Sequence, residues 1–305
     1  MGTPAFAAFC LERLLSTRHS IAAVVTRADK PRGRGMELQP SAVKRVALER
    51  GLEVLSPASA KDPALAERFR AIAPDLAVVV AYGRILPVSL IEIPRLRCIN
   101  AHASLLPKLR GAAPIERAIL EGYSETGVTI MRIAEQLDAG DMLISRAVPI
   151  HDDTDAGALR ETLARTAADL LVEAIELLAE DRARFVPQDD GQATYAPPLR
   201  RDEGHLDWYQ PAVAVCRRVR AFAPQPGAFT FADSRRLKVL HGRKAAEQTD
   251  AAPGTILGVR GECVAVACGG GIYLLDSVQP EGKRPMAAAA WARGNASIRR
   301  LGVHA

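Results

Sequence analysis

The sequence lacks the features that mark membrane and secreted proteins. No apolar run approaches the roughly 20 residues that a membrane helix requires. The apolar residues at the N-terminus are interrupted by Glu12 and Arg13, which argues against a signal peptide. The cysteines are odd in number and form no C-x-x-C pair: Cys10, Cys98, Cys216, Cys263 and Cys268. We therefore expect a cytoplasmic protein without a disulfide framework or a zinc site.

The motifs of several large enzyme classes are also missing. No G-x-G-x-x-G follows a strand pattern and no Walker sequence is present, which argues against a dinucleotide or nucleoside triphosphate site. The G-x-S-x-G turn of the α/β-hydrolases is absent. The six histidines are scattered without the spacing of metal ligands, so no metal is expected. What is present is a chain of 305 residues, 48% hydrophobic, which is enough for one large or two medium domains.

Short apolar segments alternate with helical segments over the first 188 residues. The clearest strand is DLAVVVAY at 75–82, and RCINAH at 97–102 is another. This alternation predicts an α/β domain over 1–188, with a Rossmann-like, mostly parallel sheet covered on both faces. Further strands are expected at 21–26, 52–57 and 126–133, and helices at 4–16, 41–51, 60–71, 113–121 and 156–180.

The front of this domain lacks a strand. A doubly wound sheet opens with a strand that feeds its first helix through a right-handed crossover. Here MGTPAF at 1–6 already has the pattern of the turn into that helix. Losing a central buried strand would remove core burial and open a sheet edge. We therefore expect that the true start of the protein lies upstream of Met1.

The back third differs from the front in pattern and in charge. Turn residues and charges make 189–208 a linker in our interpretation, and the short, closely spaced strands over 209–305 predict a small β-barrel of the OB type. Residues 201–305 hold 15 Lys or Arg and 9 Asp or Glu, net +6, whereas the first 200 residues have a net charge of −1. A polyanionic partner is one explanation, and an ordinary solvated surface is the other.

Two polar residues end the strand at 97–102. In open α/β sheets, ligands bind outside the carboxyl ends of the strands, and residues two apart on a strand share a face. Asn100 and His102 should therefore project into one crevice. An imidazole can accept a proton near neutral pH, and an asparagine amide can donate a hydrogen bond to a developing oxyanion. This pair suits acyl transfer, and a hydrogen-bonded structural histidine is the alternative.

Three acidic residues follow the next strand, in EQLDAGDML: Glu135, Asp138 and Asp141. A carboxylate near the histidine would fix its tautomer and favour the imidazolium. Residue type and position do not choose among the three, because each also suits a solvated turn.

Longer motifs resemble those of a known family. NAHASLLPKLRGAAPI at 100–115, ETGVTIM at 125–131 and LDAGDML at 137–143 are similar to the folate-dependent formyltransferases. The resemblance covers essentially the whole chain, from MGTPAF to VQPEGKRPM. Within this family, four features favour the branch that acts on methionyl initiator tRNA: RGAAPI, LDAGD, the loop that contains GRG at 33–35, and the basic β-domain. The resemblance implies transfer of a formyl group from 10-formyltetrahydrofolate to the methionine amino group for translation initiation. We expect the enzyme to be a monomer.

The resemblance also implies roles for individual residues. The family's catalytic triad falls on Asn100, His102 and Asp138, because its aspartate follows its histidine by 36 residues, and Asp141 is left without a role. In the family, folate lies against the loop after the strand at 75–82, and the segment after His102 shapes the pocket. The corresponding positions are Tyr82, Gly83, Arg84, Ile85, Leu86, Ser104, Leu105, Leu106 and Pro107.

The charged, glycine-rich segment 27–40 is expected to be a mobile surface loop. In the family, this loop embraces the acceptor end of tRNA, which implies Arg32 and Arg34 as tRNA-binding residues, while the β-domain contacts the tRNA body. Two positions depart from the family. Ala5 stands where an acid usually follows G-T-P, and Glu37 stands where relatives often carry a base, so a weaker grip on tRNA is expected.

Two other functions fit part of the sequence. A formyltransferase for an amino-sugar nucleotide would share the Asn-His-Asp core and a small C-terminal domain, but it would not need the arginine loop or a net-positive barrel. A non-enzymatic folate- or tRNA-binding protein is compatible with the missing strand, but the intact triad argues against it.

Overall fold

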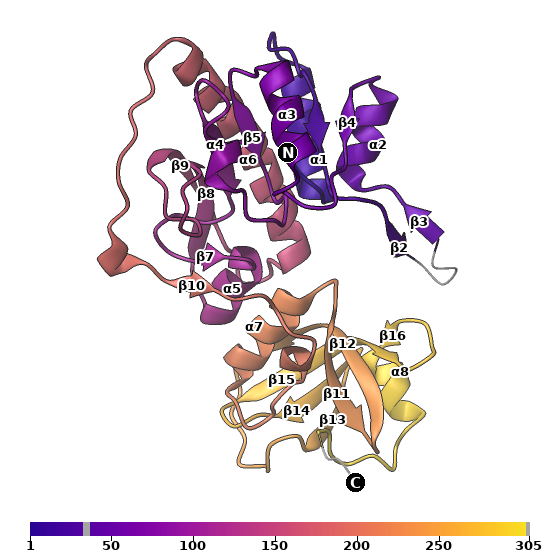
Figure 1. Ribbon diagram of the computed structural model, residues 1–305. Helices are drawn as coiled ribbons and strands as arrows, with labels where there is room; N and C mark the ends of the chain where they lie inside the picture. The colour runs from indigo at the N-terminus through magenta and orange to yellow at the C-terminus, as the bar shows by residue number, and fades with distance from the viewer. Residues whose placement is uncertain (33–36, 303–305) are drawn as a thin grey trace. The chain divides into compact units, whose positions relative to one another are not determined.

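The computed structural model describes residues 1–32 and 37–302 (Figure 1). The chain forms two compact units. The first unit comprises Met1–Pro114, Glu125–Pro149 and Arg160–Ala196, and the second comprises Ile115–Ser124, Ile150–Leu159 and Pro197–Ala305. Two short segments that precede residue 160 therefore belong to the second unit.

Short strands form the centre of the first unit. A four-stranded sheet has the order β5–β6–β8–β9, in which β5 and β6 are parallel and the other pairings are antiparallel. Two further parallel pairs are β1–β4 and β7–β10, and β2–β3 is an antiparallel hairpin. The bounds are β1 (Val24–Val25), β2 (Lys30–Arg32), β3 (Glu37–Gln39), β4 (Val54–Leu55), β5 (Ala77–Val79), β6 (Cys98–His102), β7 (Arg110–Gly111), β8 (Glu125–Arg132), β9 (Met142–Pro149) and β10 (Tyr195–Ala196).

Two helices begin at residues whose side chains cap them. Ser41 Oγ accepts a hydrogen bond from the Lys44 N–H at 3.0 Å, as expected for the N-cap of α2. Asp62 caps α3 in the same way. Of the helices in the described part of the chain, none is both long enough and apolar enough to span a bilayer. Those before residue 197 are α1 (Ala5–Leu15), α2 (Ala42–Glu49), α3 (Pro63–Ile72), α4 (Val88–Ile91), α5 (Pro114–Glu121), α6 (Ala156–Ala179) and the 3₁₀ turn η1 (Asp190–Gln192).

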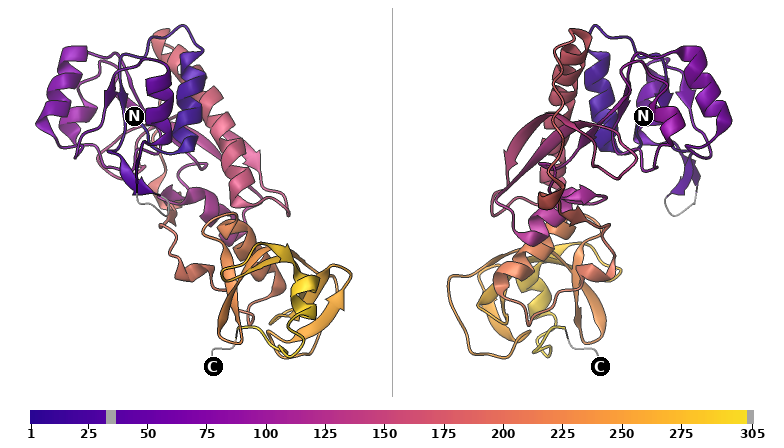
Figure 2. Two further views of the ribbon diagram at one scale, coloured as in Figure 1. Left: turned by 90° about the vertical axis from the view of Figure 1, so that its right-hand side faces the viewer. Right: turned by 60° about the vertical axis from the view of Figure 1, so that its left-hand side comes forward.

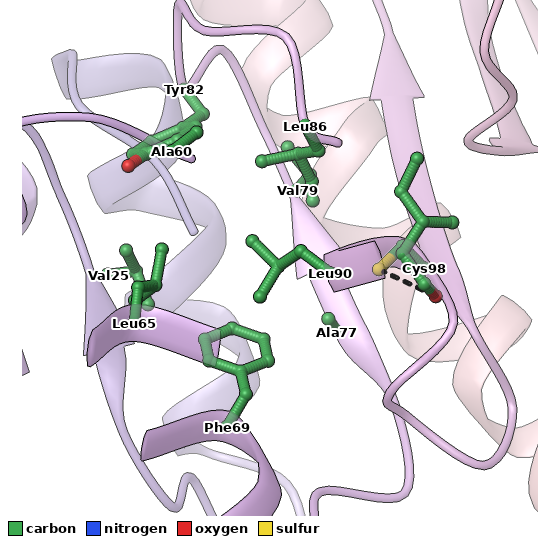
Figure 3. Packing of buried hydrophobic residues seen from close by; sticks show 11 residues of the cluster. Val25, Ala60, Leu65, Phe69, Ala77, Val79, Tyr82, Leu86, Leu90 and Cys98 are labelled. Carbon is green, nitrogen blue, oxygen red and sulfur yellow. Dashed lines mark hydrogen bonds between the residues drawn. The ribbon is translucent and has the colours of Figure 1, made fainter. Parts of the chain in front are cut away.

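Helices cover both faces of the sheet in the first unit. On one face, Val79 of β5 joins a buried cluster with Phe69 of α3 and Leu90 of α4 (Figure 3). On the other face, α1 lies beside α6 (Figure 2). Arg13 of α1 pairs there with Asp169 of α6 at 3.1 Å. The α/β architecture that the sequence predicts is therefore present, with β8 and β9 as an antiparallel margin. The register places the start of β8 beyond the carboxyl end of β6, so β8 runs back along it.

The first residues of the chain lie between β1 and β5. The Gly2 N–H donates to Val25 O at 2.9 Å, and the Val80 N–H donates to Met1 O at 2.9 Å. The amino group of Met1 donates to Val78 O at 2.6 Å. These bonds have the pattern of parallel strand pairing, but they extend over two residues only.

A cavity of about 570 Å³ has Met1 and Gly2 among its lining residues. It lies between the segments 19–25 and 72–78, with side chains of α1 and α6 along it. In the described residues, Met1 and Gly2 are the part of the chain that pairs at this position between β1 and β5, and the cavity lies next to them.

The second unit is built on an antiparallel sheet with the strand order β11–β12–β15–β14–β13, and β16 pairs with β15. The antiparallel strands that the sequence predicts are therefore present, but in the described residues the edge strands β11 and β13 do not pair with each other, so the OB-type barrel is not confirmed. The segment 299–302 lies between these edges instead: the Ile256 N–H donates to Arg299 O at 2.9 Å, and the Gly302 N–H donates to Phe231 O at 2.8 Å.

Helix α7 of this unit was not predicted. Its apolar residues Val215, Val219 and Phe222 recur at helical spacing and are buried. This spacing predicts a helix, but the strand patterns on the C-terminal side of it favoured an all-β interpretation. The elements of the second unit are η2 (Asp202–Gly204), α7 (Ala212–Phe222), β11 (Ala228–Ala232), β12 (Arg235–Lys244), β13 (Ile256–Arg260), β14 (Cys263–Ala267), β15 (Ile272–Pro280), β16 (Met286–Ala287) and α8 (Ala288–Arg293).

The five cysteines are free and buried. Burial raises the pKa of the thiols of Cys10, Cys98 and Cys268 to about 12. These thiols therefore stay protonated near neutral pH and are poor nucleophiles.

Candidate active site

Strand β6 carries two polar residues on one face. Ile99 and Ala101 alternate with them and are buried on the opposite face. Asn100 pairs with β5, and His102 pairs with Thr129 of β8. The His102 residue is 6% exposed, and Asn100 is half-buried. The two side chains therefore share a position at the carboxyl end of β6, as the sequence predicts.

The chain after β6 folds back over this end of the strand. Thr129 Oγ1 donates to Ser104 O at 2.8 Å and accepts from the Leu106 N–H at 3.1 Å. The loop then brings the carbonyl oxygen of Leu109 to 2.9 Å from His102 Nε2. The imidazole is thus held from one side by a backbone carbonyl.

Asp138 approaches the imidazole from the other side. It lies between β8 and β9 with its backbone in the left-handed region, at φ 51°. Asp138 Oδ2 is 3.6 Å from His102 Nδ1 and accepts a hydrogen bond from the Gly111 N–H at 2.9 Å. Glu135 is exposed and Asp141 is half-buried. Of these three described carboxylates, Asp138 is the one at ion-pair distance from His102.

The imidazole of His102 therefore faces two hydrogen-bond acceptors. A neutral imidazole has one N–H and can donate to either the carbonyl or the carboxylate, whereas an imidazolium has a donor for each. The ring has little contact with water, so its polar partners come from the protein.

Residues far along the chain support this arrangement. Thr194 Oγ1 accepts from the Leu109 N–H at 2.9 Å, and Thr194 O accepts from the Arg110 N–H at 2.9 Å. Gly111 has a φ of 121°, and a Cβ at this position would lie 2.8 Å from Ala196 O. The sequence did not single out Thr129 or Thr194 as partners of this loop, because both lie far from it along the chain.

The first predicted folate segment, Tyr82–Leu86, follows β5. Tyr82 and Leu86 are buried in the cluster of Figure 3, and burial raises the pKa of Tyr82. Gly83 has a φ of 76°. Arg84 is half-buried, and its Nη1 donates to a backbone carbonyl after β4 at 3.3 Å. Ile85 is 76% exposed, so this loop offers an apolar side chain at its surface.

The second predicted folate segment, Ser104–Pro107, follows β6. Ser104 and Leu106 are buried, and Ser104 Oγ closes a turn by donating to Lys108 O at 2.6 Å. Leu105 and Pro107 are half-buried. Because β5 and β6 are adjacent parallel strands, both predicted segments leave the sheet at the same edge.

One of the two predicted tRNA-binding residues, Arg32, lies in a hairpin. Arg32 ends β2, and the β2–β3 hairpin occupies part of the segment that was expected to be a loop. Arg34 lies outside the described residues. Lys44 of α2 pairs with Asp29 at 2.7 Å just before the hairpin and so ties the base of the hairpin to this helix.

Comparison with known families covers most of the chain. A family model described as "Formyl transferase" matches residues 1–175, and one described as "Formyl transferase, C-terminal domain" matches residues 198–296.

Individual relatives match at nearly full length. The methionyl-tRNA formyltransferase of Thiobacillus denitrificans is 47% identical over 97% of this chain and 95% of its own. The enzyme of the same name from Moorella thermoacetica is 44% identical over 96% of this chain and 94% of its own. Among solved structures, WlaRD, a sugar 3N-formyl transferase crystallised in the presence of dTDP and 5-N-formyl-THF, has a TM-score of 0.67 at 18% identity, over 93% of this chain and 97% of its own. This last likeness shows a shared fold.

Proposed function

Since this chain belongs to the methionyl-tRNA formyltransferase family, we propose that Asn100, His102 and Asp138 carry its reaction. The protein transfers a formyl group from 10-formyltetrahydrofolate to the amino group of methionyl initiator tRNA, for translation initiation. The observation that carries the proposal is the convergence of an amide, a buried imidazole and a carboxylate 3.6 Å from it at one end of β6.

Asn100 and His102 act on the reacting atoms. The methionine amino group attacks the formyl carbon, and negative charge develops on the formyl oxygen. The Asn100 amide donates a hydrogen bond to that oxygen, which stabilises the charge in a site that excludes water. His102 accepts the proton that the amine loses and returns it to the leaving nitrogen. For this, Nε2 must exchange the carbonyl of Leu109 for the substrate.

Asp138 acts through His102. Its carboxylate orients the ring and stabilises the imidazolium that forms when the proton is accepted. The Gly111 N–H holds the carboxylate in turn, so its position does not depend on the substrate.

The formyl donor lies, in this proposal, against Tyr82–Leu86 and Ser104–Pro107. Two observations support the fit. Both segments leave the sheet at the edge where His102 lies, and Ile85 offers an exposed apolar side chain for the flat ring system of a folate. The buried residues Tyr82, Leu86, Ser104 and Leu106 shape these segments from beneath.

The tRNA contacts are assigned to the basic parts of the chain. We propose a catalytic domain over 1–188, a linker over 189–208 and a tRNA-binding domain over 209–305, with Arg32 and Arg34 at the acceptor end. The net charge of +6 over 201–305 supports the contact with phosphates. The segment 299–302, set between the two sheet edges, supports a barrel-like domain. The protein acts in the cytoplasm as a monomer.

One assay tests the proposal directly. The protein is mixed with 10-formyltetrahydrofolate and methionyl initiator tRNA, and formylmethionine is measured. His102→Ala should lower kcat by about 1,000-fold, the loss expected for a general acid–base group, with tRNA affinity unchanged. His151→Ala, at an exposed histidine outside the site, is the control and should keep kcat.

Two results would count against the proposal. The first is the absence of product from the folded chain and from a version extended upstream of Met1. The second is a loss of tRNA affinity in His102→Ala that equals the loss of turnover, because it would make His102 structural. An amino-sugar nucleotide offered in place of tRNA should accept no formyl group.

A further inference from the structure

A single amide connects the loop of Asp138 to a buried arginine. Gln188 lies in the extended segment after α6, and its Nε2 donates to Asp138 O and to Gly140 O, both at 2.8 Å. Its Oε1 accepts from Arg110 Nε at 3.0 Å and from Arg110 Nη2 at 2.7 Å. A sulfur, Met131 Sδ, lies 3.8 Å from the same nitrogen.

The chemistry of these partners fixes the orientation of the amide. Arg110 can only donate, and the two carbonyl oxygens can only accept, so the oxygen of Gln188 must face the arginine and its nitrogen must face the loop. Both N–H groups and both lone pairs of the amide are then used. Arg110 is itself 3% exposed and pairs with Asp190 at 2.7 Å, so the amide is anchored to a side chain that cannot move freely.

The loop needs such an anchor at this position. Asp138 has a φ of 51°, a backbone conformation that costs energy for a residue other than glycine. At Gly140, a Cβ would lie 2.0 Å from Arg132 O, so the loop passes close to β8. Gln188 bonds the carbonyls of these two residues and so closes the loop around the strained aspartate.

We propose that Gln188 is a positioning residue for formyl transfer: it holds Asp138 in the conformation that places its carboxylate against His102. This rests on the role proposed above for Asp138. Without the two hydrogen bonds, the loop relaxes from its strained conformation and the carboxylate moves away from Nδ1. A misplacement of about 1 Å in a catalytic group can cost about 100-fold in rate.

The test compares Gln188→Met, which keeps the length of the side chain but has no amide, with Gln188→Glu, which keeps an acceptor for Arg110 but sets an oxygen against the two carbonyls. Gln192→Met is the matched control, at an exposed glutamine of η1 that binds Asp189 and not the loop. Urea unfolding shows which variants are folded, and Gln188→Glu carries the test if Gln188→Met does not fold. Formylation kinetics are then measured over pH 5.5–9.

We expect each folded Gln188 variant to lose about 100-fold in kcat, with the KM values for tRNA and folate within about twofold of the parent. The pH profile of kcat should move towards that of Asp138→Asn. In the Asp138→Asn background, the Gln188 substitution should add no further loss, because both act through the same carboxylate.

Three outcomes separate the hypotheses. An unchanged kcat in both Gln188 variants overturns the inference. A loss that multiplies with that of Asp138→Asn also overturns it, because Gln188 would then act by another route. If Asp138→Asn itself keeps full activity, the role proposed for Asp138 fails, and the inference about Gln188 fails with it.

Discussion

At the residue scale, the site depends on one face of one strand and on one carboxylate. Strand periodicity alone predicts that Asn100 and His102 point the same way. The carboxylate could not be chosen in this way, because Glu135, Asp138 and Asp141 lie in a loop, where side-chain direction has no fixed period. The choice requires the left-handed backbone of Asp138, which turns its carboxylate towards His102.

Replacing the Asp138 carboxylate by an amide tests the role of its charge, because the shape of the side chain is kept. Asp138→Asn can still accept from the Gly111 N–H, but it removes the negative charge 3.6 Å from His102. We expect kcat to fall by about 100-fold while folate and tRNA affinities are kept, because the charge stabilises the imidazolium only after proton transfer. The measurement is steady-state formylation.

The matched control for this variant is Glu135→Gln, at an exposed acid of the same loop. It should behave as the parent protein does. Equal effects of the two substitutions would mean that the general negative charge of the loop, and not the contact with His102, is responsible.

At the scale of elements, the short pair β7–β10 sets the loop over His102. β10 lies within the expected linker 189–208, and two-residue strands give no periodic signal from which a sequence could predict them. Pairing depends on Gly111, whose φ of 121° and closeness to Ala196 leave no room for a side chain.

Gly111→Ala should therefore disrupt both the pair and the site. The added Cβ would meet a backbone oxygen at 2.8 Å, which cannot move without breaking β7–β10. We expect a loss of about 2–4 kcal/mol in the free energy of unfolding and a fall in kcat, because the Gly111 N–H that holds Asp138 shifts as well. Urea unfolding and formylation kinetics measure the two effects.

Gly51→Ala is the control for Gly111→Ala, because it adds backbone strain without a collision of the new Cβ. Gly51 also has a positive φ, 67°, but nothing lies within 4 Å of a Cβ there. This variant should lose only about 1 kcal/mol and keep its kcat. If the two alanine variants lose the same stability, the close approach to Ala196 has no effect of its own.

At the scale of the whole molecule, charge is divided unevenly along the chain. If the second unit contacts phosphates, tRNA affinity should fall about tenfold or more between 50 and 200 mM salt, since each contact releases counterions. Arg235→Gln with Arg299→Gln, at exposed positions of that unit, should flatten the salt dependence, and Arg165→Gln, exposed on α6, should not. A salt-independent affinity of the parent protein would argue against phosphate contacts.

The cavity between β1 and β5 is the second property of the whole molecule that can be tested. Burial lowers the pKa of the Met1 amino group from 8.0 to about 6. The unfolded chain then binds this proton more tightly than the folded chain, so the free energy of unfolding should decrease as the pH falls from 8 to 6.

Five Val or Ile residues placed before Met1 should fill the cavity, replace the amino group by an amide and raise stability by about 2–4 kcal/mol.

A Gly-Ser extension of equal length is the control. It also removes the amino group, so the pH dependence that Met1 contributes should disappear in both extended variants. Only the apolar extension should raise the urea midpoint at pH 8, because only it buries apolar surface. Equal midpoints for the two extensions would mean that the cavity does not accept a strand.

The sequence by itself determined the periodic and chemical features of this protein. It predicted the α/β order of the first unit, the shared face of Asn100 and His102, and the family to which the chain belongs. These features depend on residue type and on short, regular spacing, because strands and helices each have a fixed residue period. It also predicted a small β-barrel over 209–305, of which the described residues show the antiparallel sheet without a closed barrel, because closure depends on which edges meet.

Only the tertiary structure decided the features that depend on contacts between residues far apart in the chain. It set the Asp138 carboxylate 3.6 Å from His102, set Thr194 and Gln188 against loops that lie far from them in the chain, and put the segment 299–302 between the edges of the second sheet. Each of these contacts joins residues without a common period, so they are fixed only when the whole chain has packed.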